Sequence, residues 1–362
     1  MRDPSVGLYV HIPFCRSKCG YCDFASVAGE ENKIDRYLAS LAREMERSAG
    51  TKIKTLFIGG GTPTLLSPDQ IDHLFGRLRA CFDFSSLVEA SVEANPESAD
   101  DDRLRAFQRG GIDRLSFGLQ STHDRHLKEL GRLHDHSVFL ERFKRARQLG
   151  FRNINVDVMF GLPHQTSTDF EETLKELIAL SPEHISAYAL KVEEETPLGR
   201  AGFRPDDEME ADLYLLASDL LSRNGYHHYE ISNFAKPGTE CLHNVAYWDN
   251  GPTLGIGLGA ASHRSPRRWK NTSDLDSYMS GGKEDGPVLE EDVVLDEQKE
   301  ANEKIMLGLR LSRGVAADSL HKMKLPVVEN FLTEGLAVET KGMYRLTPKG
   351  WLLSNQLFHH LV

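Results

Sequence analysis

Short apolar segments alternate with amphipathic helical segments from Gly7 to about residue 230, and this alternation limits the fold more strictly than any other feature of the chain. The pattern is typical of repeated strand and helix units that build a parallel sheet. We expect an α/β fold in which strands lie at residues 7–11, 54–59, 88–93, 114–118, 155–159 and 184–190. Helices fall between them, and the helical period is clearest in the stripe formed by Ile34, Tyr37, Leu38, Leu41 and Met45.

Polar or glycine-rich residues mark the carboxyl ends of four of these strands. The segments are 59–63, 93–96 and 118–120, together with Asp157 inside the fifth strand. In a barrel of parallel strands these ends share one face, where active sites gather. Each segment alone could be a helix cap or a turn. Their common position on four strands favours a binding site.

Cys15, Cys19 and Cys22 place three thiols within eight residues. Three thiolates can hold three corners of a 4Fe-4S cube and leave the fourth iron open for a ligand. A structural zinc site is the alternative, but zinc sites of that kind use four ligands, and Cys81 and Cys241 lie far away in the sequence. Both interpretations require reduced thiols.

Composition agrees with a reducing compartment. Five cysteines in 362 residues are too few and too unevenly spaced for a disulfide framework, and the N-terminus does not resemble a signal peptide. No run reaches the ~18 apolar residues of a membrane span. The net charge of -11 argues against a general nucleic-acid binder. We therefore expect a soluble cytoplasmic protein without nucleic acid as a partner and without an integral membrane segment; peripheral membrane contact stays compatible with these observations.

The pattern changes after about Leu254, and we expect two domains, at residues 1–290 and 291–362. The second domain should contain helices at 296–311, 316–321 and 327–333, a hairpin between 337–338 and 344–346, and a final helix at 349–360. This order is similar to a winged helix, a fold that binds DNA in many proteins and serves as a lid in others. The acidic chain, which has no dense Lys/Arg recognition helix, favours a helical or winged-helix-like lid.

The CX3CX2C spacing of the three cysteines, with Gly-Gly-Gly-Thr-Pro at 59–63, resembles the radical S-adenosylmethionine superfamily over most of residues 7–270. The resemblance implies a partial (βα)6, TIM-like barrel with a 4Fe-4S cluster on Cys15, Cys19 and Cys22. It also implies S-adenosylmethionine on the open iron, where the superfamily generates a 5′-deoxyadenosyl radical.

Within this superfamily, segments 9–15, 118–120 and 157–163 resemble the oxygen-independent coproporphyrinogen III dehydrogenases, called HemN, and the related HemW heme chaperones. By this resemblance Glu93 suits the amine of S-adenosylmethionine, Arg132 its carboxylate and Asp157 a ribose hydroxyl. The full set of residues implied to contact S-adenosylmethionine is Tyr9, Tyr21, Gly60, Gly61, Thr62, Glu93, Gln120, Arg132, Asp157 and Ala189.

Two features separate the relatives. The dehydrogenases carry a further cysteine at the position of Phe24 and a longer N-terminal extension. Residues 243–248, His-Asn-Val-Ala-Tyr-Trp, resemble the HNXXYW motif of the HemW family. The resemblance implies a chaperone that binds heme in segment 241–270 and hands it to acceptor haemoproteins. His243 is the candidate axial ligand, and Tyr247 and Trp248 offer apolar faces to a porphyrin.

Several alternatives stay open at this point. Cys241 could ligate the heme iron in place of His243, or both could be structural. The basic residues at 264–270 could pair with porphyrin propionates or form a solvated patch. The second candidate function is the decarboxylation of coproporphyrinogen III, and the third is a nucleic-acid-binding regulator. The sequence leaves undecided the heme acceptor, the electron donor, enzymatic turnover, cleavage of S-adenosylmethionine, and whether the chain forms a homodimer.

Overall fold

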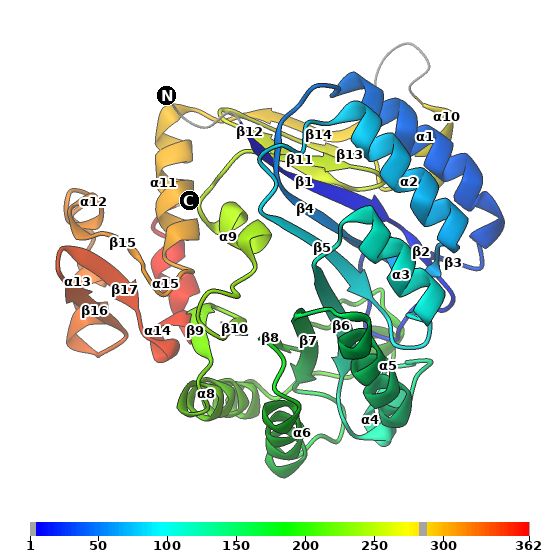
Figure 1. Ribbon diagram of the computed structural model, residues 1–362. Coiled ribbons are helices and arrows are strands. Elements are labelled where there is room, and N and C mark those ends of the chain that lie inside the picture. Colours follow the sequence, from blue (N-terminus) through cyan, green and yellow to red (C-terminus); the bar gives the residue numbers. More distant parts are fainter. Residues whose placement is uncertain (1–4, 282–287, 362) are drawn as a thin grey trace.

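A computed structural model describes residues 5–281 and 288–361 (Figure 1). Its main sheet has twelve strands in the order β14-β13-β12-β11-β1-β4-β5-β6-β7-β8-β10-β9. The six expected strands form its parallel centre, which confirms the predicted α/β class. They are β1 (Val6–Ile12), β4 (Ile53–Gly60), β5 (Glu89–Ala94), β6 (Arg114–Gln120), β7 (Asn153–Phe160) and β8 (His184–Ala189).

Helices cover the outer face of this curved sheet (Figure 1). The long ones are α1 (Ile34–Arg47), α2 (Pro68–Cys81), α3 (Asp101–Gly110), α5 (His136–Leu149), α6 (Ser167–Leu180) and α8 (Asp207–Arg223). Shorter helices are α4 (Asp124–Glu129), α7 (Pro197–Arg200) and α10 (Leu275–Ser280). All five residues of the apolar stripe expected on α1 are buried and belong to the hydrophobic core.

Apolar and polar side chains alternate along the strands, so that one set packs against the helices and the other faces the inside of the barrel. In β6 the apolar residues Leu115, Phe117 and Leu119 belong to the hydrophobic core. Ser116, Gly118 and Gln120 occupy the alternate positions and line a cavity inside the sheet. Successive side chains of a strand point to opposite faces, so one strand can both pack against helices and supply polar groups to the interior.

The curved sheet does not close. β11 (Thr253–Ile256) runs parallel to β1 and is followed by β12 (Ala261–Arg264), β13 (Arg267–Asn271) and β14 (Leu289–Val294). The other edge is formed by β10 (Asn233–Ala235) and β9 (His227–Glu230). Within the described ranges no ladder joins β14 to β9, so the barrel is partial. Helix α9 (Leu242–Trp248) lies between the two ends of the sheet (Figure 1).

The C-terminal elements stand beside this opening (Figure 1). They are α11 (Glu297–Gly308), α12 (Ala317–His321), α13 (Pro326–Thr333), and a three-stranded sheet of β15 (Val315–Ala316), β17 (Met343–Leu346) and β16 (Ala337–Thr340). The boundary predicted at residue 290 falls inside β14, which still pairs with β13 in the main sheet.

The single final helix expected at 349–360 is wrong. The structure has two short helices there, α14 (Pro348–Leu352) and α15 (Ser354–Phe358). Leu353 between them leaves the helical conformation, and the hydroxyl of Ser354 donates to the carbonyl oxygen of Trp351 at 2.8 Å. A serine that bonds a nearby carbonyl competes with the helical hydrogen bonds, which explains the break.

Among the residues that the structure describes, no helix is both long and apolar enough to cross a membrane.

Candidate functional site

A cavity of about 440 Å³ lies inside the partial barrel. Nearly all the residues predicted from the sequence to bind the cluster or S-adenosylmethionine line it. They are Tyr9, Cys15, Cys19, Tyr21, Cys22, Gly60, Gly61, Thr62, Glu93, Gln120, Arg132 and Asp157. Ala189, at the end of β8, lies outside the lining set of the described residues. The fold thus collects side chains that are up to 148 residues apart in the sequence, from Tyr9 to Asp157.

The three thiols stand at one end of this cavity, each near a polar side chain. The hydroxyl of Thr62 donates to Sγ of Cys15 at 3.5 Å, and Nη1 of Arg132 donates to Sγ of Cys19 at 3.6 Å. Sγ of Cys22 lies 3.9 Å from Oγ of Ser26. Donors near sulfur stabilise the thiolates that an iron-sulfur cluster needs, so this donor set fits a three-cysteine cluster.

Glycines let the backbone approach the thiol loop. Gly60 has φ +117°, and a Cβ there would lie 2.5 Å from the ring of His11. A Cβ on Gly61 would lie 2.8 Å from the carbonyl oxygens of Pro13 and Phe14. Neither position accepts a side chain. The cradle therefore leaves main-chain groups free to contact a ligand closely, as the amino-acid end of S-adenosylmethionine would require.

Two carboxylates face the same space from β5 and β7, the strands on either side of β6. Glu93 accepts a hydrogen bond from the amide of Gly60 at 2.9 Å, and burial raises its pKa to about 7. Asp157 accepts from Nδ2 of Asn155 at 2.7 Å, and burial raises its pKa as well. Buried carboxylates with few cationic neighbours gain from a cationic or hydroxyl-bearing ligand, because such a ligand supplies the missing partner.

Arg132 connects the cysteine loop to the ends of the strands. Its Nη2 donates to Oδ1 of Asn95 and to the carbonyl oxygen of Gly118, both at 2.8 Å. Gln120, which has φ +75°, accepts a hydrogen bond from the hydroxyl of Tyr188 at 3.1 Å. The guanidinium is thus fixed between the cysteine loop and the strand ends, where it can meet an anionic group.

Segment 93–96, which the sequence singled out, supplies Asn95 to the lining, but Ser116, Asn155 and Tyr188 were not predicted. The signal that could have found these three is a polar residue at alternate positions of a strand, as in Ser116 on β6, Asn155 and Asp157 on β7, or Ser186 and Tyr188 on β8. Such residues face the interior of a barrel.

The HNXXYW-like segment lies in α9, and His243, Asn244 and Tyr247 from this helix line the same cavity. His243 is 1% exposed, and its Nδ1 lies 2.8 Å from the hydroxyl of Thr55. Its Nε2 lies 3.1 Å from the hydroxyl of Tyr247. The ring stacks on Phe57 at a centroid distance of 5.3 Å, and burial lowers its pKa to about 3. His243 is therefore a neutral, fully hydrogen-bonded side chain in this structure.

A buried carboxylate fixes the start of α9. Glu89 accepts from the backbone amides of Leu242 at 2.9 Å and His243 at 3.1 Å. The thiol of Cys241 is 3.6 Å from the same carboxylate, and burial raises its pKa to about 12. The fully buried Arg114 supplies a nearby positive charge. These contacts fix α9 against the floor of the barrel.

Comparison with known proteins identifies the family. A model of the Radical SAM superfamily matches residues 9–177. The chain is 36% identical to the heme chaperone HemW of Bacillus subtilis, and the match covers 97% of each chain. It is 40% identical to the heme chaperone HemW of Escherichia coli over 71% of this chain and 70% of that protein. The chain belongs to the HemW family.

The fold of this HemW family member also resembles a solved structure. That structure is described as coproporphyrinogen III oxidase (HemN) from Escherichia coli, a radical SAM enzyme. The two chains superpose with a TM-score of 0.84 at 25% identity, over 99% of this chain and 90% of the other. As a radical SAM family, the HemW proteins imply a 4Fe-4S cluster and S-adenosylmethionine, which the cavity described above fits.

Three residues that the sequence offered as heme contacts in this HemW family member, Trp248, Arg267 and Arg268, lie outside the lining sets of both cavities among the described residues. The ring of Trp248 lies 5.3 Å from the guanidinium of Arg310, at the junction with the C-terminal elements. The guanidinium of Arg267 pairs with Asp292 at 2.7 Å, and that of Arg268 pairs with Glu303 at 2.6 Å. Each of the two arginines thus has a carboxylate partner within the chain.

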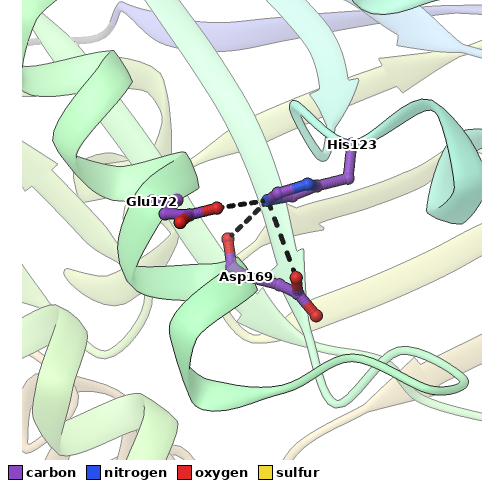
Figure 2. Close-up of side chains that lie close together, drawn as sticks. All are labelled: His123, Asp169 and Glu172. Atoms are coloured by element: carbon purple, nitrogen blue, oxygen red, sulfur yellow. Dashed lines mark hydrogen bonds and ion pairs between the residues drawn. The ribbon is translucent and has the colours of Figure 1, made fainter.

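A separate group of potential metal ligands consists of His123, Asp169 and Glu172 (Figure 2). Nε2 of His123 lies 3.5 Å from Glu172 and 4.0 Å from the carboxylate of Asp169. Asp169 already accepts a hydrogen bond from the amide of Thr166, in the capping box of α6, and forms an ion pair with Arg125. Burial alone would raise the pKa of Asp169, but these partners lower it to about 2. We assign the group to fixing the start of α6.

Proposed function

We propose that the protein is a heme chaperone, which binds heme and delivers it to acceptor haemoproteins. The observation that supports this most strongly is the 36% identity to a heme chaperone over 97% of the chain. A second observation agrees with it. Phe24, where the dehydrogenases carry a further cysteine, is 63% exposed at the edge of the cavity and offers an apolar face to a flat ligand.

We further propose that Cys15, Cys19 and Cys22 hold the 4Fe-4S cluster and that S-adenosylmethionine occupies the adjoining cavity. Glu93 would receive its amine, Arg132 its carboxylate and Asp157 a ribose hydroxyl. When bound, the cluster and S-adenosylmethionine supply one-electron chemistry. The chain's own part is to orient the ligand and to neutralise its charged groups through these three side chains.

The similarity to the HemN structure favours a second candidate function, the oxidative decarboxylation of coproporphyrinogen III. One experiment separates the two functions. Protein reconstituted anaerobically with iron and sulfide receives either heme, or coproporphyrinogen III together with a reductant and S-adenosylmethionine. We expect a stoichiometric heme complex with a distinct Soret band, transfer of that heme to an apo-haemoprotein, and unchanged coproporphyrinogen III. Turnover of the porphyrinogen without stable heme binding would establish the enzyme instead.

The remaining partners are predictions of the same proposal. We expect an electron donor for the cluster, a haemoprotein acceptor, and a cytoplasmic location for the protein itself. Sedimentation of the reconstituted protein with and without heme tests whether a homodimer forms. Binding to phospholipid vesicles tests peripheral membrane contact.

A further inference from the structure

Residues 241–248 offer three side chains that could ligate iron, and the surroundings of these side chains differ. His243 has both ring nitrogens within hydrogen-bond distance of hydroxyl groups and is 1% exposed. Cys241 is 0% exposed, and its thiol lies 3.6 Å from the buried carboxylate of Glu89, so a heme cannot reach its sulfur without displacing the start of α9. Tyr247 is 37% exposed. Its hydroxyl is hydrogen-bonded to Nε2 of His243 alone among the described side chains.

Position supports the tyrosine as well. A second cavity of about 400 Å³ adjoins the first, and Tyr9, Phe24, Gly60, Glu93 and Tyr247 line both. Tyr247 thus stands where the two spaces meet. A ligand in the second cavity would lie beside the proposed S-adenosylmethionine site and share Tyr9, Gly60 and Glu93 with it.

The second cavity has the character that a porphyrin needs. Phe24 is an exposed aromatic side chain on its wall, and the backbone carbonyl oxygen of Phe24 accepts from Nζ of Lys18 at 3.2 Å. Ala260 and Ala261 add small apolar groups. Lys270 lines the same cavity and pairs with Glu290 at 3.0 Å, so its ammonium can turn to a propionate at the cost of one exposed ion pair.

We propose that Tyr247 is the residue of this segment that ligates heme iron, with the macrocycle in the second cavity against Phe24. The inference rests on the proposed heme-binding function and names the ligand of that site. Tyrosine is an established axial ligand of heme iron. His243 is then a positioning residue, because its Nε2 holds the phenol oxygen at 3.1 Å and Phe57 holds the ring of His243.

The coordination step balances without a further reactant. The bond between ferric iron and the phenol oxygen forms, the O–H bond breaks, and one proton per heme leaves to solvent. A phenol has an ordinary pKa of about 10, so Tyr247 carries its proton at neutral pH until iron binds. Coordination to a cationic metal removes a proton of this kind. The chain from Thr55 through His243 to Tyr247 stays hydrogen-bonded, because the hydroxyl of Thr55 can donate or accept.

The test titrates hemin into protein with an intact cluster and records absorption and resonance Raman spectra. Wild-type protein should bind one heme and show phenolate vibrations and a phenolate-to-iron charge-transfer band. Tyr247→Phe should lose both signals and bind hemin at least about tenfold more weakly, the equivalent of about 1.4 kcal/mol. His243→Gln should keep the phenolate signals with shifted frequencies. Cys241→Ser should leave the spectrum unchanged.

Controls separate the possible failures. Tyr226→Phe removes a hydroxyl that bonds to Pro182 outside both cavities, and it should match the wild type. Iron content and circular dichroism show whether each variant is folded, and Phe24→Ala should weaken binding while the phenolate signals persist. If Tyr247→Phe binds heme with an unchanged spectrum, the tyrosine assignment is wrong and the chaperone proposal stands. If wild-type protein binds no heme, both are rejected.

Discussion

The cysteine loop and helix α9 line one cavity, and each carries a motif that is recognisable in the sequence. In the loop, Cys15, Cys19 and Cys22 line the cavity, and each sulfur has a polar neighbour at 3.5 to 3.9 Å. At α9, His243 and the N-cap residue Cys241 are buried and hydrogen-bonded to the protein. The comparison teaches that a ligand-type residue becomes a ligand only where the fold leaves its donor atom without a stronger partner.

The largest expected effect lies at the loop. Cys15→Ser should reduce the iron content from about four per chain to nearly none, because two thiolates cannot hold the cube. Iron and acid-labile sulfide analysis after anaerobic reconstitution measures this. Cys81→Ser is the matched control, since Cys81 is buried at the end of α2. Equal loss of iron in both variants would show that the cluster is not a three-cysteine site.

The next effect tests whether α9 is fixed structurally. Glu89→Ala should lower the free energy of unfolding by about 4 kcal/mol, because it leaves the charge of Arg114 and the amides of α9 without their buried acceptor. Urea unfolding measures the change. Glu208→Ala, on the exposed start of α8, should cost far less. A similar small loss for both would mean that α9 is held by other contacts.

A pH effect should appear at the S-adenosylmethionine end of the cavity. Burial raises the pKa of Glu93 from 4.5 to about 7, so the folded state binds a proton more tightly than the unfolded chain. The contribution of the protonated Glu93 carboxyl to stability is full below pH 4.5 and is lost as the pH rises through about 7. Its total is about 3 kcal/mol. The free energy of unfolding, measured from pH 5 to 8, should therefore fall less steeply with pH in Glu93→Gln than in the wild type. Glu208→Gln should leave the wild-type pH dependence unchanged.

The smallest effect concerns the donors around the sulfurs. Thr62→Val removes the hydroxyl that lies 3.5 Å from Sγ of Cys15, and a hydrogen bond of this kind favours the reduced, more negative cluster. The cluster should still assemble, but its reduction potential should fall by about 40 mV, the one-electron equivalent of about 1 kcal/mol. A redox titration followed by electron paramagnetic resonance measures this. An unchanged or raised potential would contradict the contact.

The sequence alone determined the parallel sheet, the cysteine loop and most of the lining of the cavity. Alternating apolar segments need a sheet covered by helices, and polar residues at strand ends meet on one face whatever the details of packing. Glu93 and Asp157 illustrate this, since both lie where their strand positions predicted. Ala189 illustrates the limit, because one step along a strand turns a side chain to the other face.

Only the tertiary structure decided what α9 does. Its residue types suggest a histidine or cysteine ligand. In the structure Thr55 is hydrogen-bonded to His243, and Glu89 and Arg114 lie beside Cys241, and all three come from strands distant in the sequence. Likewise, the pairing of Arg267 with Asp292 depends on β14 lying beside β13. Burial and hydrogen-bond partners are set by long-range packing, which local sequence does not encode. The exposure of Tyr247 and the enclosure of His243 follow from that packing.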